Sequence, residues 1–442
     1  MEEELKNQLA QKLKDRTAVI GIIGLGYVGL PLAIEYVHAG YRVVGFEISD
    51  RKIKLINSGG SDIGDVPAKE VKKAVTAKKL RATRDFSQMK DCDVCAICVP
   101  TPLSKTKDPD VSYILTAVME LKKSLRKEML VILESTTYPG TTEELILPEL
   151  EETGLKCGKD FYLAFSPERV DPGNAIYQTK NTPRVVGGHT PRCQQMAKIF
   201  YEAAINHVHM VSSTQAAEMV KLLENTFRSV NIGLVNEVAL MCDRLKLNVW
   251  EIIDAASSKP FGFMPFFPGP GLGGHCIPID PHYLSWKLKS LNYYSRFIEL
   301  AGDVNSHMPE YVLDRIARNL NQRKKSINGS KVVVLGVAYK RDIADVRESP
   351  ALDCINLLQR AGAKVYYNDP FVPEIRFDEH HKIDMKSTKL TAPLIKSADL
   401  IVVVTDHSSY DYQWIVDNAA AVFDTRNATK KVKRNRKKIE RL

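Results

Sequence analysis

The apolar residues of the first half of the chain come in short runs, separated by longer amphipathic and polar stretches. Residues 18–48, AVIGIIGLGYVGLPLAIEYVHAGYRVVGFEI, predict a strand, a glycine turn, a helix and a second strand. Further apolar runs at 93–100, 129–135, 163–170 and 182–188 predict more strands. Repeated strand–helix units of this kind indicate a parallel, doubly wound sheet.

The pattern changes at Ser212. Residues 212–248 contain no strand signal and predict one long helix, with Ser212 and Gln215 as a capping box at its start. Further helices are expected at about 249–258 and 281–320. Together these elements predict a middle domain rich in helix.

A polar linker at 321–330 precedes a second strand–helix alternation, in KVVVLGVAY, AKVYYNDP, ADLIVVVTD and AVFDTR. Its first turn, 336–340, lacks the three glycines of a dinucleotide-binding turn, so we expect it to hold a different nucleotide or none. Lys340 and Arg347 beside this turn suit phosphate, or are ordinary surface charge. The predicted fold class is α/β, with two Rossmann-like doubly wound parallel-sheet domains joined by a helical middle domain with one long helix. The expected domains are 1–211, 212–320 and 321–442.

A dinucleotide fingerprint lies where the first predicted strand meets the first helix. Gly24, Gly26 and Gly29 stand at this junction, as a tight turn and close approach to a pyrophosphate require. Glu47 ends the second strand, 18 residues after Gly29, where a carboxylate accepts hydrogen bonds from a ribose 2′-hydroxyl. Because a carboxylate there repels a 2′-phosphate, the predicted cofactor is NAD and not NADP.

The stretch 265–281, PFFPGPGLGGHCIPIDP, is so rich in glycine and proline that it must be a loop with unusual dihedrals or close backbone approach. Glycine amides beside the thiol of Cys276, with Asp280 four residues later, suggest an anion-binding cradle next to a nucleophile. A plain surface loop with a buried free cysteine is the alternative. Lys221 and Asn225 are four apart, so they share one face of the long helix, which is either functional or simply solvated.

Charge and composition exclude several classes of protein. The formal charge is +9, but residues 430–442 carry eight Lys and Arg against one Glu, so the rest of the chain is nearly neutral. This basic tail is expected to be a disordered, solvated end, and nucleic acid is not a predicted partner. Residues 17–34 carry no charge, but four glycines and Pro31 argue against a membrane span. With no secretory signal at its start, the chain is expected to be cytoplasmic.

The eight cysteines are scattered along the chain. Cys92, Cys95 and Cys98 have the two-residue spacing of iron–sulfur ligands, but the fourth Cys-Pro of that pattern is missing. DVCAICV predicts a buried strand instead. No metal site is predicted.

Six motifs make the chain resemble the nucleotide-sugar dehydrogenases, the UDP-glucose/GDP-mannose dehydrogenase family. They are GLGYVGLP at 24–31, ESTTYPGTT at 134–142, SPER at 166–169, VKLLENTFR at 220–228, GPGLGGHCIPIDP at 269–281 and YKRDIADVRES at 339–349. The resemblance implies NAD-dependent oxidation of a sugar nucleotide to its uronic acid. It also implies an NAD domain, a helical middle that forms a homodimer across the long helix, and a UDP domain.

The resemblance also implies roles for individual residues. Cys276 matches the nucleophile, and the groups around the reacting carbon match Lys221, Asn225 and Asp280. The water-handling positions match Thr137 and Glu168. The positions that hold the UDP-sugar match Arg169, Val170, Arg228, Gly273, Tyr339, Lys340 and Arg426. The NAD contacts match Tyr27, Val28, Glu47, Thr101 and Arg347.

The sequence around the cysteine looks most like the UDP-N-acetylglucosamine 6-dehydrogenases. Relatives that act on UDP-N-acetylmannosamine carry a His-Pro-Arg element where this chain has 260–262, Pro-Phe-Gly. The expected reaction is therefore four-electron oxidation at C6 of UDP-N-acetylglucosamine, with UDP-N-acetylmannosamine or UDP-glucose as alternative substrates. Outside this class, the alternatives are a two-electron hydroxyacid dehydrogenase, which has a similar Lys-x-x-x-Asn helix, and a non-catalytic NAD-binding protein.

Overall fold

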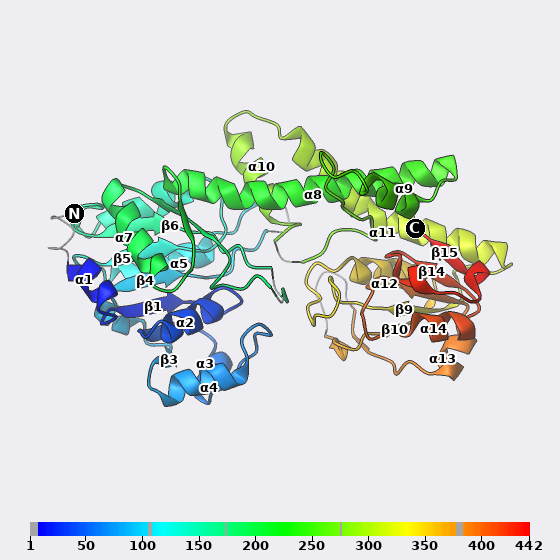
Figure 1. Cartoon of the computed structure of the whole chain (residues 1–442), viewed down its shortest axis with the longest axis horizontal. Coiled ribbons are helices and arrows are strands. Elements are labelled where there is room, and N and C mark those ends of the chain that lie inside the picture. The colour runs from blue at the N-terminus through cyan, green and yellow to red at the C-terminus, as the bar shows by residue number, and fades with distance from the viewer. Residues whose placement is uncertain (1–7, 105–107, 172, 175, 275, 377–382) are drawn as a thin grey trace. The chain divides into compact units, whose positions relative to one another are not determined.

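The computed structural model describes residues 8–104, 108–171, 173–174, 176–274, 276–376 and 383–442. The chain forms two compact units, each built on one main sheet (Figure 1). Unit 1 contains Met1–Glu224 and His282–Tyr293, and unit 2 contains Asn225–Pro281 and Tyr294–Leu442.

Unit 1 contains an eight-stranded sheet in the order β3-β2-β1-β4-β5-β6-β7-β8, parallel except between β6 and β7. A parallel pair needs a crossover segment, usually a helix, and the described residues of 166–183 between these two strands include none. Strand β7 therefore returns antiparallel. The strand expected at 163–170 ends at Phe165, so SPER lies in a loop. The strands are β1 Val19–Ile23, β2 Arg42–Phe46, β3 Leu80–Thr83, β4 Val94–Ile97, β5 Leu130–Leu133, β6 Tyr162–Phe165, β7 Arg184–Gly188 and β8 Val208–Met210.

Alternate residues of the central strands enter two hydrophobic cores, one on each face of this sheet. Around β4, Ala96 and Cys98 belong to one core, and Cys92, Cys95 and Ile97 to the other. All three cysteines are buried, and the strand interpretation of DVCAICV is confirmed. The helices within residues 8–211 are α1 Gln8–Lys14, α2 Gly29–His38, α3 Asp50–Asn57, α4 Ala68–Thr76, α5 Ser112–Lys122, α6 Leu147–Glu151 and α7 Pro191–Glu202, with the 3₁₀-helix η2 Phe86–Asp91 and the π-helix η3 Thr142–Ile146.

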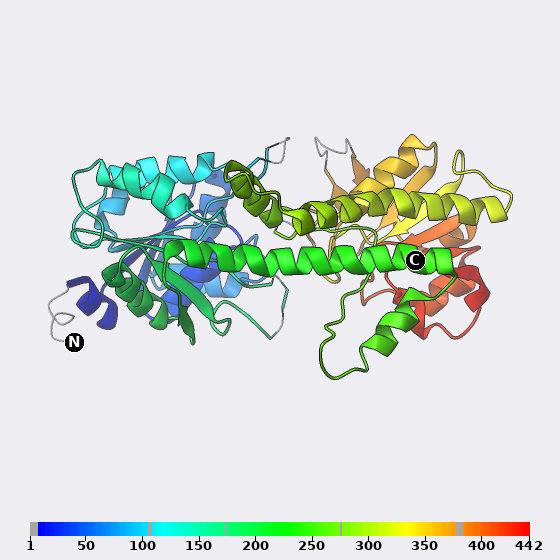
Figure 2. The same cartoon turned by 90° about the horizontal axis from the view of Figure 1, so that it is seen from above.

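The expected long helix is α8, Thr214–Leu245, continuous over 32 residues (Figure 2). It begins two residues later than predicted, because the Ser213 hydroxyl, and not Ser212, accepts the Ala216 N–H at 3.1 Å. Gln215 instead donates to a carboxylate outside the helix, so the capping-box prediction is wrong. None of the described helices, α8 included, is both long and apolar enough to cross a bilayer.

Three described helices lie between α8 and the strands of the second sheet. The first, α9, spans Val249–Ala256, as predicted. The stretch expected to be helical over 281–320 is two helices, α10 Asp280–Ser290 and α11 Arg296–Gln322. Asn292 in the connection has φ +56°, which no helix continues through.

Unit 2 contains a five-stranded parallel sheet in the order β10-β9-β13-β14-β15. Its first four strands in sequence confirm the second strand–helix alternation. The strands are β9 Lys331–Leu335, β10 Lys364–Asn368, β13 Leu400–Val403, β14 Val422–Asp424 and β15 Ile439–Arg441, and a two-stranded sheet pairs β11 Glu374–Ile375 with β12 Met385–Lys386. The helices beside the larger sheet are α12 Pro350–Arg360, α13 Ala392–Ser397 and α14 Tyr412–Asn418, followed by the turns η4 Ala428–Lys431 and η5 Arg436–Lys438.

The basic segment 430–442 is ordered, so the prediction of a disordered tail is wrong. It supplies β15, which pairs in parallel with β14. Arg434 forms an ion pair of 2.7 Å with Asp417, and the Lys438 ammonium donates to the carbonyls of Val416 and Asp417 at the end of α14. Cations stabilise helix C-termini, so these charges have partners within the fold.

Candidate active site

The glycine turn between β1 and α2 has the geometry of a dinucleotide-binding turn. Gly24 has φ +90°, and a Cβ there would lie 2.6 Å from the carbonyl oxygen of Cys98. A Cβ on Gly29 would lie 1.9 Å from the carbonyl oxygen of Gly24. In contrast, no described atom lies within 4 Å of the Cβ position of Gly26. Two glycines are therefore needed by the fold, and the third leaves open space before the N-terminus of α2, which fits a pyrophosphate.

Glu47 follows β2 directly and lies against this turn. Its Oε2 accepts from the backbone N–H of Leu25 at 3.2 Å, and its Oε1 accepts from Ile48 and Ser49. Glu47 is partly exposed, and its Oε2 has a second lone pair for a hydroxyl donor. This acceptor therefore fits the ribose of NAD. Of the other predicted NAD contacts in unit 1, Tyr27 is exposed, Val28 partly buried and Thr101 buried.

The loop after β5 carries Thr137, which is buried and hydrogen-bonded to Thr141 at 2.6 Å. Glu218 on α8 fixes this loop by accepting from the backbone N–H of Gly140 at 2.6 Å and of Thr142 at 2.9 Å. Burial raises the pKa of Glu218 to about 7 despite these hydrogen bonds. The first turns of α8 thus hold the loop in which one predicted water-handling residue lies.

The other predicted water-handling residue, Glu168, is held from two sides. Its Oε1 accepts from the backbone N–H groups of Arg169 at 2.7 Å and Val170 at 2.9 Å. Its Oε2 lies 3.1 Å from the guanidinium of Arg184, which also lies 3.3 Å from Glu134. Burial lowers the pKa of Arg184, but these two carboxylates outweigh it and raise that pKa. The Glu168 carboxylate therefore has one fixed orientation.

Two cations near these groups differ in their pairing. Arg169 donates from Nε to Glu224 at 2.9 Å and from Nη1 to the carbonyl of Pro183 at 2.7 Å. Lys221, on the same helix as Glu224, is only 8% exposed, and its ammonium makes no hydrogen bond or ion pair with any described residue. A buried ammonium without a partner is costly, so Lys221 is a candidate to contact a ligand.

In unit 2, the structure brings together three predicted catalytic residues. The side-chain amide of Asn225 on α8 donates to the carboxylate of Asp280, and both residues are buried. The backbone N–H of Asp280 in turn donates to the carbonyl of Cys276 at 2.8 Å. Cys276 is partly exposed. Lys221 and Asn225 are both buried positions of α8, which favours the functional interpretation of that face over a solvated one.

The glycine-rich loop packs on the turn after β9 and on the end of β14. A Cβ on Gly273 would lie 2.7 Å from Tyr339 Cβ, and one on Gly274 would lie 2.8 Å from the Tyr339 ring. A Cβ on Gly269 would lie 2.5 Å from the Arg426 guanidinium. The backbone N–H of Gly274 also donates to the carbonyl of Arg347 at 3.1 Å. Much of the glycine content is thus explained by close packing against two predicted substrate residues.

The remaining predicted residues are less closely joined to this cluster. Arg228 is exposed on α8, and Lys340 is partly exposed beside Tyr339. Arg347 forms an ion pair of 2.6 Å with Asp345. A cavity of about 390 Å³ in unit 2 is lined by the ends of α8 and β15 and the start of α9, and none of the predicted site residues line it.

Five buried charged or titratable residues that hold these loops were not predicted from the sequence. They are Glu134, Arg184, Glu218, Asp369 and His407. Glu134 and Arg184 could have been predicted, because Glu134 directly follows the apolar run VIL and Arg184 directly precedes VVGG. A charge beside a buried strand must be paired. The other three gave no local signal, because their partners lie far away in the sequence.

Comparison with known proteins accounts for nearly the whole chain. Residues 18–205 match the UDP-glucose/GDP-mannose dehydrogenase family, NAD binding domain, residues 215–307 its central domain, and residues 333–431 its UDP binding domain. The chain is 36% identical over 392 residues to the UDP-N-acetyl-D-mannosamine dehydrogenase of Pyrococcus horikoshii. The matched region covers 88% of this chain and 90% of that protein. It is 34% identical over 393 residues to the UDP-N-acetyl-D-glucosamine 6-dehydrogenase of Pseudomonas aeruginosa, over 88% and 91% of the two chains.

A solved structure agrees with these sequence matches. The UDP-N-acetyl-D-mannosamine dehydrogenase structure from Pyrococcus horikoshii superposes with a TM-score of 0.85 at 35% identity, covering 93% of this chain and 96% of that one. The resemblance drawn from the six motifs is confirmed at the level of the family. Since the relatives include proteins named for either sugar, these matches do not choose between glucosamine and mannosamine.

Proposed function

Because the chain belongs to the UDP-glucose/GDP-mannose dehydrogenase family, we propose that it oxidises C6 of UDP-N-acetylglucosamine to a carboxylate, with NAD as oxidant. One observation carries this proposal. In unit 2, Cys276 adjoins the buried pair of Asn225 and Asp280, within the loop that packs on Tyr339 and Arg426. This arrangement joins a thiol for covalent chemistry to a turn suited to a nucleotide.

The choice of sugar rests on a different feature. The Pro-Phe-Gly at 260–262 lacks the two cations of the His-Pro-Arg element, which favours the glucosamine substrate over UDP-N-acetylmannosamine. UDP-glucose is the next alternative. The three-domain division and a cytoplasmic location also remain predictions.

Oxidation of an alcohol to an acid removes four electrons, so two hydrides leave C6 in succession, and bound NAD supplies the acceptor for each. The first step also releases the hydroxyl proton, and Lys221 stabilises the negative charge that develops on that oxygen. The thiolate of Cys276 then adds to the aldehyde carbon, and the resulting oxyanion takes up a proton to form a thiohemiacetal. Loss of the second hydride and of that proton gives a thioester, and water hydrolyses it to the acid and the free thiol.

The groups proposed for the hydrolysis are already oriented. Asn225 and Asp280 hold the water, and Glu168 takes its proton. Glu168 Oε1 already accepts two backbone N–H groups, whereas Oε2, which pairs with Arg184, retains a lone pair for a water molecule. The proposed role of Thr137 is to hold this water through its hydroxyl, next to Thr141.

The proposed partner is a second copy of this chain across α8. Six large apolar side chains on this helix are exposed, at spacings of four, four, seven, seven and four residues that place them on one face. They are Met219, Leu223, Phe227, Leu234, Met241 and Leu245, which are 37–67% exposed. Such a stripe supports the homodimer and gives no support to nucleic acid or membrane as a partner.

The stoichiometry of NADH formation tests the reaction class. Purified protein should yield two NADH per UDP-N-acetylglucosamine consumed. One NADH per substrate would favour a two-electron hydroxyacid dehydrogenase, and none with any UDP-sugar would favour a non-catalytic NAD-binding protein.

A further inference from the structure

The turn after the first strand has the same backbone geometry in both Rossmann-like sheets. In unit 1, Gly24 has φ +90° and donates its N–H to the last residue of β2 at 2.8 Å. In unit 2, Gly336 has φ +80° and donates its N–H to the last residue of β10 at 2.9 Å. A carboxylate follows each of these strands, Glu47 in unit 1 and Asp369 in unit 2. Glu47 and Asp369 therefore occupy equivalent positions.

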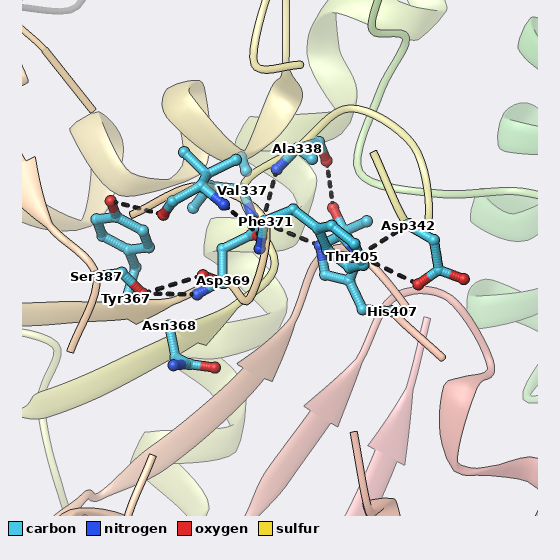
Figure 3. Close-up of polar contacts among 12 residues, drawn as sticks. Val337, Ala338, Asp342, Tyr367, Asn368, Asp369, Phe371, Ser387, Thr405 and His407 are labelled. Atoms are coloured by element: carbon cyan, nitrogen blue, oxygen red, sulfur yellow. Dashed lines mark hydrogen bonds and ion pairs between the residues drawn. The ribbon is translucent and has the colours of Figure 1, made fainter. Parts of the chain in front are cut away.

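The two carboxylates are used differently. Glu47 is partly exposed and accepts one N–H from its glycine turn. The Asp369 side chain is 0% exposed, and its Oδ2 accepts from the turn at Val337, 2.7 Å, and Ala338, 3.0 Å (Figure 3). Its Oδ1 accepts two further N–H groups, from Phe371 and Val372. Asp369 therefore has no exposed oxygen for a ribose hydroxyl.

His407 completes this network and has a defined tautomer. Its Nδ1 accepts the backbone N–H of Asp342 at 2.9 Å, so Nδ1 carries no hydrogen. Its Nε2–H then donates to Asp369 at 2.9 Å, from a ring that is 0% exposed (Figure 3). The neutral imidazole thus links the carboxylate after β10 to the far end of the turn after β9. Burial raises the pKa of Asp369, but the bonds from His407 and the backbone outweigh it and lower that pKa.

The backbone is fixed on both sides of Tyr339 and Lys340. On the near side, Asp369 holds the N–H groups of Val337 and Ala338. On the far side, His407 holds the N–H of Asp342. Two linked residues that fix the two ends of a turn restrict where the backbone between them places its side chains.

We infer that Asp369 and His407 are positioning residues for the uridine diphosphate part of the substrate. They hold the 337–342 turn so that Tyr339 and Lys340 are placed before the ligand arrives. In unit 1 the equivalent carboxylate, Glu47, is available to a ribose, whereas the carboxylate of Asp369 is occupied by the turn and by His407. The second sheet therefore takes a nucleoside diphosphate and not NAD. This inference rests on the proposed function, because that function places the UDP-sugar at Tyr339 and Lys340.

Two substitutions of one residue test the inference. His407→Leu removes both hydrogen bonds, whereas His407→Gln retains an amide N–H for Asp369 and loses the acceptor for Asp342. We expect the leucine variant to raise the KM for UDP-sugar at least tenfold, with kcat within threefold at saturation. The KM for NAD should be unchanged. The glutamine variant should raise the KM for UDP-sugar two- to fivefold.

Ser387→Ala is the matched control. The Ser387 hydroxyl contacts the backbone of Asp369, accepting its N–H at 3.0 Å, and does not contact the turn. This variant should lower the melting temperature but leave the KM for UDP-sugar within twofold. If the KM of all three variants follows their melting temperatures, or if kcat falls while KM stays constant, the inference is overturned. Should the leucine variant not fold, an unchanged KM in His407→Gln overturns it.

Calorimetric titration with UDP alone separates this inference from the proposed function. If the wild type binds UDP but oxidises no UDP-sugar, the proposed reaction fails, and weaker UDP binding in His407→Gln still supports the positioning role. Equal UDP affinity in the wild type and His407→Gln overturns it. A wild type that binds no UDP overturns both.

Discussion

The Glu218 carboxylate accepts a hydrogen bond of 2.9 Å from the backbone N–H of Thr142. Burial raises the pKa of Glu218 from 4.5 to about 7. The folded protein therefore holds this proton more tightly than the unfolded chain does. The resulting stabilisation is complete below pH 4.5 and is lost as the pH rises through about 7, an effect on the order of 3 kcal/mol at most.

We expect Glu218→Gln to remove this dependence. Between pH 5 and 8, the melting temperature of the variant should fall less than that of the wild type, measured by calorimetry or dye fluorescence. Glu237→Gln, at a partly exposed position of α8, is the control and should keep the wild-type slope. Parallel profiles for the wild type and Glu218→Gln would show that Glu218 does not titrate in this range.

Lys221→Met should separate stability from catalysis. Methionine fills a similar volume and does not leave a buried ammonium without a described partner, so the melting temperature should stay constant or rise. Loss of the charge that stabilises the alkoxide should lower kcat by about a thousandfold, as for other groups of this kind. Lys198→Met, at an exposed position of α7, should leave kcat unchanged. A kcat within tenfold of the wild type would remove Lys221 from its proposed role.

Cys276→Ala should retain the fold, NAD binding and UDP-sugar binding but lose acid formation by several orders of magnitude. The covalent route to the thioester needs the thiol. Because hydride transfer between alcohol and aldehyde does not, reduction of a supplied UDP-sugar aldehyde by NADH should survive. Cys157→Ala is the control, since Cys157 is also a partly exposed cysteine outside any described disulfide. Acid production within tenfold of the wild type would contradict the covalent mechanism and favour oxidation of a hydrated aldehyde.

The position of Glu47 predicts a preference for NAD over NADP. Its carboxylate lies against the glycine turn, where it would repel a 2′-phosphate. The ratio of kcat/KM for NAD to that for NADP should be large in the wild type and should fall at least tenfold in Glu47→Gln. Equal turnover with both cofactors at matched concentrations would show that Glu47 does not contact the ribose.

The Pro-Phe-Gly sequence at 260–262 predicts which nucleotide sugar is the best substrate. UDP-N-acetylglucosamine should have the highest kcat/KM when compared with UDP-N-acetylmannosamine, UDP-glucose and GDP-mannose. A higher value for UDP-N-acetylmannosamine would refute the argument from the missing His-Pro-Arg element, although the reaction class would stand.

Features encoded within a few neighbouring residues were predictable. The alternation of strands and helices and the glycine turn at 24–29 depend on local periodicity and backbone geometry, and both are present. The predicted start of α8 was wrong because Ser212 and Ser213 are equally good N-cap residues in the sequence. Only the folded backbone shows that Ser213 is the N-cap. The loop at 265–281 was correctly placed as irregular, but its packing against Tyr339 could not be foreseen.

The features that were missed depend on partners distant in the sequence. Asp369 and His407 are 38 residues apart, and neither belongs to a local motif. The basic tail was predicted to be disordered from its charge alone. Its order depends on Asp417 and the end of α14, which a count of charges does not reveal.

The interleaving of the two units constrains how the protein is made. Residues 282–293 belong to unit 1, where Tyr283 bonds to Pro102 and Lys287 pairs with Glu144, although unit 2 begins at Asn225. On the ribosome, the first Rossmann sheet can therefore be complete while this part of its unit is still being synthesised. Release of the first 224 residues alone would leave the surfaces around Pro102 and Glu144 uncovered, so any separately expressed NAD-binding fragment needs the 282–293 segment supplied with it.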